Sequence, residues 1–106
     1  MIKINFLMNE ENELYGFKIS GHAGFAKSGK DIVCSAVSIL GINAVNSIET
    51  LCEDGFVVDR NDEKGLLRLE LKDRPSKEAL LLLDSFKLGI DLIHDSYGDK
   101  YIRIES

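Results

Sequence analysis

The chain has 106 residues, of which 44% are apolar and 29% charged, and its net charge is −5. This length suits one domain over residues 1–106, and the acidic balance argues against direct nucleic-acid binding, which depends on neutralising phosphates. No apolar run of about 20 residues and no signal-peptide pattern stand out, so we expect no membrane span and a cytoplasmic location.

The first half of the chain predicts a hairpin, a loop and a helix. Apolar residues alternate over residues 2–8 and 13–20, which is typical of two paired strands. Residues 21–31 contain three glycines and no clear period, which indicates a long loop. Over residues 32–51 apolar residues recur every three or four positions, which predicts an amphipathic helix. Gly41 in its middle costs about 1 kcal/mol relative to alanine, and either close packing or a backbone approach explains it.

The second half repeats this order and adds a final strand. A hairpin is predicted from residues 56–60 and 66–72. Pro75 and Ser76 mark the start of a second helix that stops at Gly98, and residues 101–104 form a short strand. The order strand-strand-helix-strand-strand-helix-strand predicts an α+β two-layer sandwich, with a largely antiparallel sheet and two helices on one face.

A cysteine close to a helix start is the strongest chemical signal. Cys34 falls at about the third position of the first predicted helix, where unpaired N–H groups and the helix dipole favour a thiolate. Lys27 and Lys30 add positive charge nearby. The glycine-containing loop allows His22 to fold back over this helix start, and a thiol with a neighbouring imidazole suffices for covalent acyl transfer.

Several residues around this pair have two interpretations. The cysteine is alternatively a small buried hydrophobe and the histidine merely solvated. Asp31 either orients His22 or serves only as the helix N-cap. Ser38, one turn after Cys34, either supports the site or bonds back to the helix backbone. Gly21 is either a hinge beside His22 or an ordinary glycine at a strand end.

The remaining cysteine and histidine carry no predicted function. Cys52 lies near the end of the same helix, too far from Cys34 for a disulfide and at the end where the dipole disfavours a thiolate. His94 lies late in the second helix, where a solvated cation is favourable. This scatter fits no common zinc spacing, so no metal and no cofactor are expected.

The stretch from Gly21 to Leu40 resembles the signature of the ribosomal-processing cysteine protease family, Prp. The matching positions are Gly21, His22, Asp31, Ile32, Val33, Cys34, Ser35, Ala36, Val37 and Ser38. The resemblance implies a bacterial endopeptidase that removes the N-terminal extension of a large-subunit ribosomal protein, works as a homodimer, and uses Cys34 as nucleophile and His22 as base. A non-catalytic, ribosome-associated dimeric interaction module is the alternative.

The loop is then predicted to close over an extended peptide and complete the site. It consists of Ala23, Gly24, Phe25, Ala26, Lys27, Ser28, Gly29 and Lys30. Backbone N–H groups at the helix start are candidates for an oxyanion hole.

Overall fold

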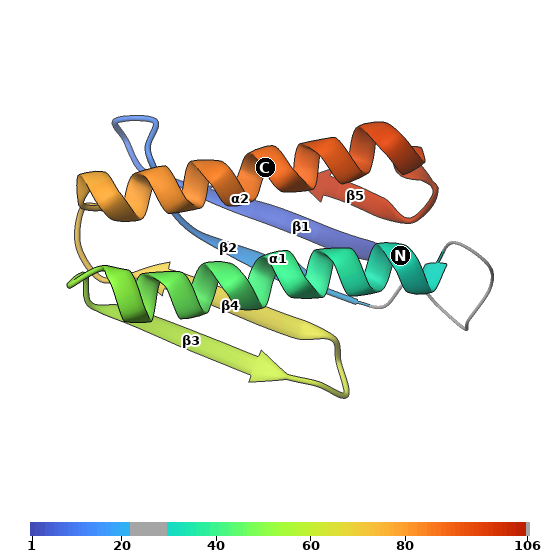
Figure 1. The fold of residues 1–106 in the computed structure, drawn as a ribbon, viewed down its shortest axis with the longest axis horizontal. Helices are drawn as coiled ribbons and strands as arrows, with labels where there is room; N and C mark the ends of the chain where they lie inside the picture. Colours follow the sequence, from blue (N-terminus) through green and yellow to red (C-terminus); the bar gives the residue numbers. More distant parts are fainter. Residues whose placement is uncertain (22–29, 106) are drawn as a thin grey trace.

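The computed structural model describes residues 1–21 and 30–105, and the side chains of residues 30 and 31 lie outside that description. Five strands and two long helices alternate as the sequence predicts (Figure 1). They are β1 (Ile2–Met8), β2 (Leu14–Ser20), α1 (Lys30–Leu51), β3 (Phe56–Asn61), β4 (Leu66–Leu71), α2 (Lys77–Tyr97), the short 3₁₀ turn η1 (Gly98–Lys100) and β5 (Ile102–Glu105).

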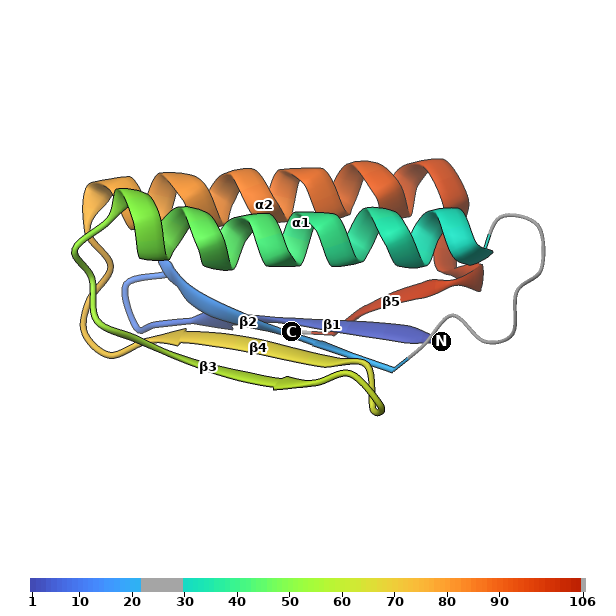
Figure 2. The same ribbon diagram turned by 60° about the horizontal axis from the view of Figure 1, so that its bottom comes forward.

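The strands form one sheet in the order β3-β4-β2-β1-β5. Neighbouring strands are antiparallel except for β5, which returns from α2 to pair in parallel with β1. Both helices lie on the same face of the sheet and run antiparallel to each other (Figure 2). The predicted α+β two-layer sandwich is therefore confirmed.

The core lies between the sheet and the helices. In β1, Ile2, Ile4 and Phe6 are buried, because alternate residues of a strand point to the same face. The ring of Phe86 from α2 stacks on Phe17 from β2, with ring centroids 4.1 Å apart. Full burial of one such large apolar side chain contributes about 1.5–3 kcal/mol, so this layer supplies most of the stability that holds the helices in place.

The start of α1 differs from the prediction. The helix begins at Lys30, so Asp31 lies inside its first turn and the predicted N-cap role of Asp31 is wrong. Cys34 is consequently the fifth helical residue rather than about the third. The cause is local: residues 30 and 31 are both polar, and a polar first turn carries no apolar periodicity.

The helix α1 is more apolar than its core-facing side requires. Among the helices of the described residues, it alone is long and apolar enough to cross a membrane by length and composition. No such apolar run was expected from the sequence. Core helices of soluble proteins pass the same test. Val33, Val37, Ala44 and Ile48 are buried against the rest of the fold. Leu51 was predicted to join this stripe, but it is exposed at the last residue of the helix.

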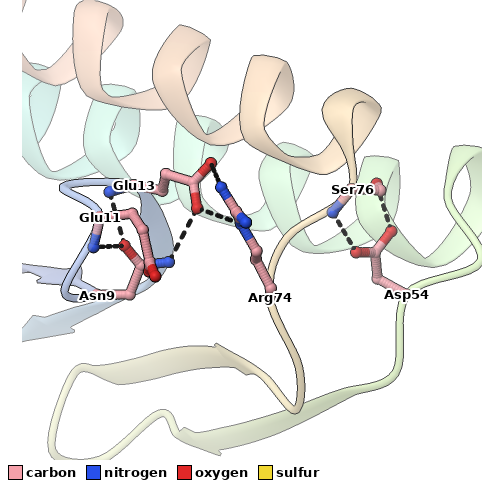
Figure 3. A network of polar contacts seen from close by, with 6 residues as sticks. All are labelled: Asn9, Glu11, Glu13, Asp54, Arg74 and Ser76. Carbon is pink, nitrogen blue, oxygen red and sulfur yellow. Dashed lines mark hydrogen bonds and ion pairs between the residues drawn. The ribbon is translucent and has the colours of Figure 1, made fainter.

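A polar network fixes the start of α2 (Figure 3). The Asp54 carboxylate accepts hydrogen bonds from the Ser76 backbone N–H at 2.8 Å and from its hydroxyl at 2.6 Å. The Ser76 hydroxyl in turn accepts from the Ala79 N–H, which confirms Ser76 as the N-cap. Beside it, Arg74 is ion-paired with Glu13 from the β1–β2 turn. These contacts join the α1–β3 connection, through Asp54, and the β1–β2 turn, through Glu13, to the segment at the start of α2.

The Asp54 contacts predict an acid-dependent loss of stability. Partial burial alone would raise the pKa of Asp54, but the hydrogen bonds from Ser76 outweigh it and lower the pKa. A carboxyl whose pKa is lower in the folded state stabilises fully above its unfolded pKa of about 3.9, and this contribution is lost as the pH falls through the folded pKa. Urea unfolding should therefore show Asp54→Asn less stable than wild type at pH 6, with a gap that narrows towards pH 3. The exposed Asp59→Asn serves as control, and a gap independent of pH would contradict this account.

Candidate active site

Cys34 lies on the wall of a pocket of about 160 Å³ between the N-terminal half of α1 and the sheet. The pocket lies where β2 ends and where the β3–β4 hairpin turns, beside the first residue of β1. Its lining comprises Ile2, Ile19, Gly21, Cys34, Val37, Ser38, Ile42, Arg60, Asp62, Gly65, Leu66 and Leu67. Three of the residues singled out in the sequence, Gly21, Cys34 and Ser38, therefore meet in one cavity.

The helical repeat explains why Cys34 and Ser38 share this wall. Residues four apart lie one turn apart on the same side of a helix. Val33 and Val37 are buried towards the sheet, which fixes the rotation of α1 about its axis. Cys34 is then half-buried at the flank of the helix that faces β4, and Ser38 is more exposed on the same flank. A thiol and a hydroxyl are thereby presented to the same space.

Gly21 directly follows β2 and has a conformation that other residues rarely adopt. Its φ is +87°, and a Cβ built on it would lie 2.5 Å from the carbonyl oxygen of Met1. On its other side, the Gly21 N–H donates to the carbonyl of Lys64 at 3.4 Å. The residue before His22 is thus enclosed by backbone from two neighbouring segments, which supports a sharp turn at this point rather than an ordinary strand-end glycine.

Replacing Gly21 by alanine is expected to displace the segment that leads into His22. A left-handed conformation costs a non-glycine residue roughly 1–2 kcal/mol, and here the added methyl also meets backbone that cannot rotate away. Thermal unfolding of Gly21→Ala should show a loss of stability of at least this size. The fall in kcat/KM for peptide cleavage, converted to free energy, should be larger than that loss of stability. Gly98→Ala is the control, because Gly98 has a similar φ of +73° with open space around its Cβ position. Equal cleavage by both variants would refute a positioning role.

The hairpin side of the pocket was not anticipated from the sequence. Arg60 and Asp62 stand on the rim and form an ion pair, with Arg60 Nε 2.8 Å from Asp62 Oδ1. Because both side chains are largely exposed, the pair contributes little to stability. Leu66 and Leu67 form part of the apolar wall. They are strand residues, and no local sequence signal places β4 next to β2 and so beneath α1.

The other predicted site residues lie at or beyond the limits of the description. His22 and loop residues 23–29 lie outside the described residues. Lys30 and Asp31 belong to the first turn of α1, where a carboxylate at residue 31 is favoured by the helix dipole. The roles of His22 as base, of Asp31 as its orienting partner and of the loop in substrate binding therefore stay predictions.

Neither Cys52 nor His94 lines this pocket. Cys52 directly follows α1, and neither it nor Cys34 forms a disulfide. Burial, with additional contributions from the Asp54 and Glu78 carboxylates, raises the pKa of Cys52. His94 in the last turn of α2 contacts Asp99. Among the side chains of residues 1–21 and 32–105, no group of three acidic, histidine or cysteine residues is placed to hold a metal ion.

Comparison with known proteins points to one family. The model of the family described as cysteine protease Prp matches residues 1–103. Two relatives are named ribosomal processing cysteine protease Prp. The one from Staphylococcus aureus is 26% identical, and the match covers 93% of both chains. The one from Bacillus subtilis is also 26% identical, and the match covers 93% of this chain and 92% of its own. The crystal structure of the S. aureus protease with a substrate peptide is 26% identical, covers 99% of this chain and 98% of its own, and superimposes with a TM-score of 0.90.

A second structure of the S. aureus protease, with a covalently linked product peptide, gives a TM-score of 0.88 at 27% identity over 99% of this chain and 98% of its own. The match therefore extends over the whole sandwich, including the pocket and the start of α1. The chain belongs to the Prp family of cysteine proteases.

Proposed function

We propose that this protein is a cytoplasmic cysteine endopeptidase that removes the N-terminal extension of a large-subunit ribosomal protein. The observation that carries the proposal is the position of Cys34 on the pocket wall, beside the strand end that leads into His22. The relatives' name, ribosomal processing cysteine protease, supports the substrate class. The net charge of −5 supports it too, because an acidic enzyme attracts a basic ribosomal protein.

The reaction proceeds through a thioester. His22 takes the proton of the Cys34 thiol, and the thiolate attacks the scissile carbonyl carbon. The tetrahedral oxyanion is stabilised by backbone N–H groups of the first turn of α1, which lack acceptors within the helix. The C–N bond then breaks as His22 returns its proton to the leaving amine. Water hydrolyses the thioester, which releases the extension and restores the thiol.

Two side chains have supporting roles in this scheme. Asp31, in the first turn of α1, orients the His22 ring and stabilises its protonated form. Ser38 lines the pocket one turn beyond Cys34 and offers a hydroxyl to the bound peptide backbone. The loop of residues 23–29 closes over the extended peptide and completes the site.

The pocket beside Cys34 suits an apolar side chain next to the scissile bond. Apart from its charged rim, its side chains are mainly aliphatic, including Ile2, Ile19, Val37 and Leu67. Its volume of about 160 Å³ resembles that of an apolar cavity of about 150 Å³ that binds benzene in another protein. A substrate side chain up to the size of an aromatic ring therefore fits.

The test is incubation with the organism's own large-subunit ribosomal protein, prepared with its N-terminal extension and analysed by mass spectrometry. We expect one released peptide and one shortened protein whose masses sum to that of the substrate plus water. The same ribosomal protein prepared without the extension is the control and should stay intact. An extended substrate that remains uncut would refute the proposal and favour a non-catalytic interaction module.

We further propose that the active form is a homodimer joined through the outer face of the helical layer. Five large apolar residues of this layer are 59–72% exposed: Ile32 and Ile39 on α1, and Leu81, Leu88 and Leu92 on α2. On α1 the exposed residues Ser35 and Asn46 are uncharged, whereas Asp84 and Asp95 on α2 are charged and exposed. Exposed apolar side chains gathered on two neighbouring helices are typical of a surface that binds another protein chain.

Leu88→Glu is expected to convert the dimer into a monomer. Burying a leucine contributes about 1.5–3 kcal/mol, and a two-fold interface contains each residue twice, so the dimer dissociation constant should rise at least about a hundredfold. Light scattering coupled to size-exclusion chromatography measures this. Val57→Glu is the matched control, since Val57 is an exposed apolar residue on β3, away from the helical layer. A dimer that survives Leu88→Glu but not Val57→Glu would place the interface elsewhere.

A further inference from the structure

The pocket beside Cys34 is bounded below by two side chains whose positions depend on a glycine that is not part of its lining. We infer that Gly41, in the middle of α1, sets the size of this pocket and thereby the size of the substrate side chain that the enzyme accepts. This inference rests on the proposed function for the substrate, but the pocket itself is tested below without proteolysis.

The first step is the contact beneath Gly41. A Cβ on this residue would lie 2.7 Å from Ile19 Cδ1 and 3.0 Å from Leu67 Cδ2. Real Cβ atoms essentially never approach a neighbour as closely as the first distance, so these two side chains occupy the space that a methyl group would need. Close packing, and not a backbone approach, therefore explains a glycine in the interior of a long helix.

The second step is that both of these side chains line the pocket. Ile19 from β2 and Leu67 from β4 lie in its wall together with Cys34. Because Gly41 has no side chain, Ile19 and Leu67 pack directly against the backbone of α1. The cavity therefore keeps its present size. The helical residues that flank Gly41 on this side, Ser38 and Ile42, also line the pocket.

The third step is the direction in which the two side chains would move. The next nearest atom is Phe17 Cε1, at 3.8 Å, and Phe17 is fully buried and stacked on Phe86. Displacement towards Phe17 is therefore blocked by close packing. The open side is the pocket, so a methyl group at Gly41 pushes the flexible ends of Ile19 and Leu67 into it.

The pocket size is measured by alkylating the thiol with reagents of graded size. N-methyl- and N-benzyl-iodoacetamide carry the same reactive carbon, and the rate ratio of benzyl to methyl reports how well a ring is accommodated beside the thiol. Cys52 in the same molecule is the internal reference, because it lies outside this pocket. In the wild type we expect the ratio at Cys34 to exceed that at Cys52.

Gly41→Ala should lower the benzyl-to-methyl ratio at Cys34 by about tenfold or more, the scale of discrimination that one methylene gives in an apolar pocket. Gly89→Ala is the matched control: it is also a mid-helix glycine, its Cβ would meet Leu40 Cδ1 at 2.9 Å, and it lies outside this pocket. That variant should leave the ratio unchanged. An unchanged ratio in Gly41→Ala, or an equal fall in both variants, would overturn the inference.

A second-site change keeps the test decisive. Gly41→Ala/Ile19→Val lacks the Cδ1 atom that the new methyl meets, so its ratio should return to within about threefold of wild type. Should Gly41→Ala fail to fold, Ile19→Val alone is expected to raise the ratio, and no rise would overturn the inference.

Peptide cleavage then connects the pocket to the substrate. Extension peptides with alanine, leucine or phenylalanine before the scissile bond should show a selective loss of kcat/KM for phenylalanine in Gly41→Ala. A uniform loss across the peptides would overturn the assignment. Failure of the wild type to cut any of them would instead refute the proposed function while the alkylation ratios still stand.

Discussion

Cys34→Ala is expected to reduce kcat for removal of the extension by a factor on the order of 10⁴–10⁶, because loss of a catalytic nucleophile removes the covalent route altogether. The variant should still fold, since Cys34 is only half-buried and alanine favours the helix. Single-turnover cleavage, followed by mass spectrometry with enzyme in excess, measures the residual rate.

The second cysteine provides the control for this experiment. Cys52→Ala removes a thiol of similar exposure that lies beyond the end of α1, outside the pocket. It should retain kcat within about twofold, as changes remote from the reacting groups usually do. If the alanine variants of both cysteines cut the substrate equally well, Cys34 is not the nucleophile.

His22→Ala has the second-largest expected effect, a fall in kcat of about 10²–10⁴ at pH 7. Without the imidazole, no general base removes the Cys34 proton, so the thiolate forms only by ionisation to solvent. The residual activity of the variant should therefore depend more steeply on pH than the activity of the wild type. A pH series of kcat measures this difference.

His94→Gln is the matched control for this histidine. His94 lies in the last turn of α2, contacts Asp99 and is not part of the pocket lining. Its replacement should leave the shape of the pH profile unchanged. If His94→Gln alters the pH profile and His22→Ala does not, His22 is not the base.

Local patterns were sufficient to predict most of the secondary structure. The alternation in β1 and β2 and the 3.6-residue period of the helices follow directly from which side chains must reach the core. The ends of α2 were predicted well because Ser76 and Gly98 carry capping chemistry that is visible in the sequence. The start of α1 was missed because a polar first turn has no such marker.

The pocket required knowledge that local patterns do not contain. Cys34, Ser38 and Gly21 were found because they lie on one continuous segment of the chain. Arg60 and Leu67 line the same cavity only because β4 pairs with β2, a long-range contact that no residue in either strand specifies by itself. The role of Gly41 likewise emerges only when Ile19 and Leu67 are placed beneath it.

The central claim is that Cys34 attacks the carbonyl at the end of the extension. Its most direct test is a peptide chloromethyl ketone that carries the extension sequence up to the scissile residue, analysed by intact mass and peptide mapping. The account predicts one adduct per chain, on Cys34 alone, with cleavage activity lost in proportion to labelling. An adduct on Cys52 with Cys34 unmodified, or full activity in a protein completely labelled at Cys34, would contradict it.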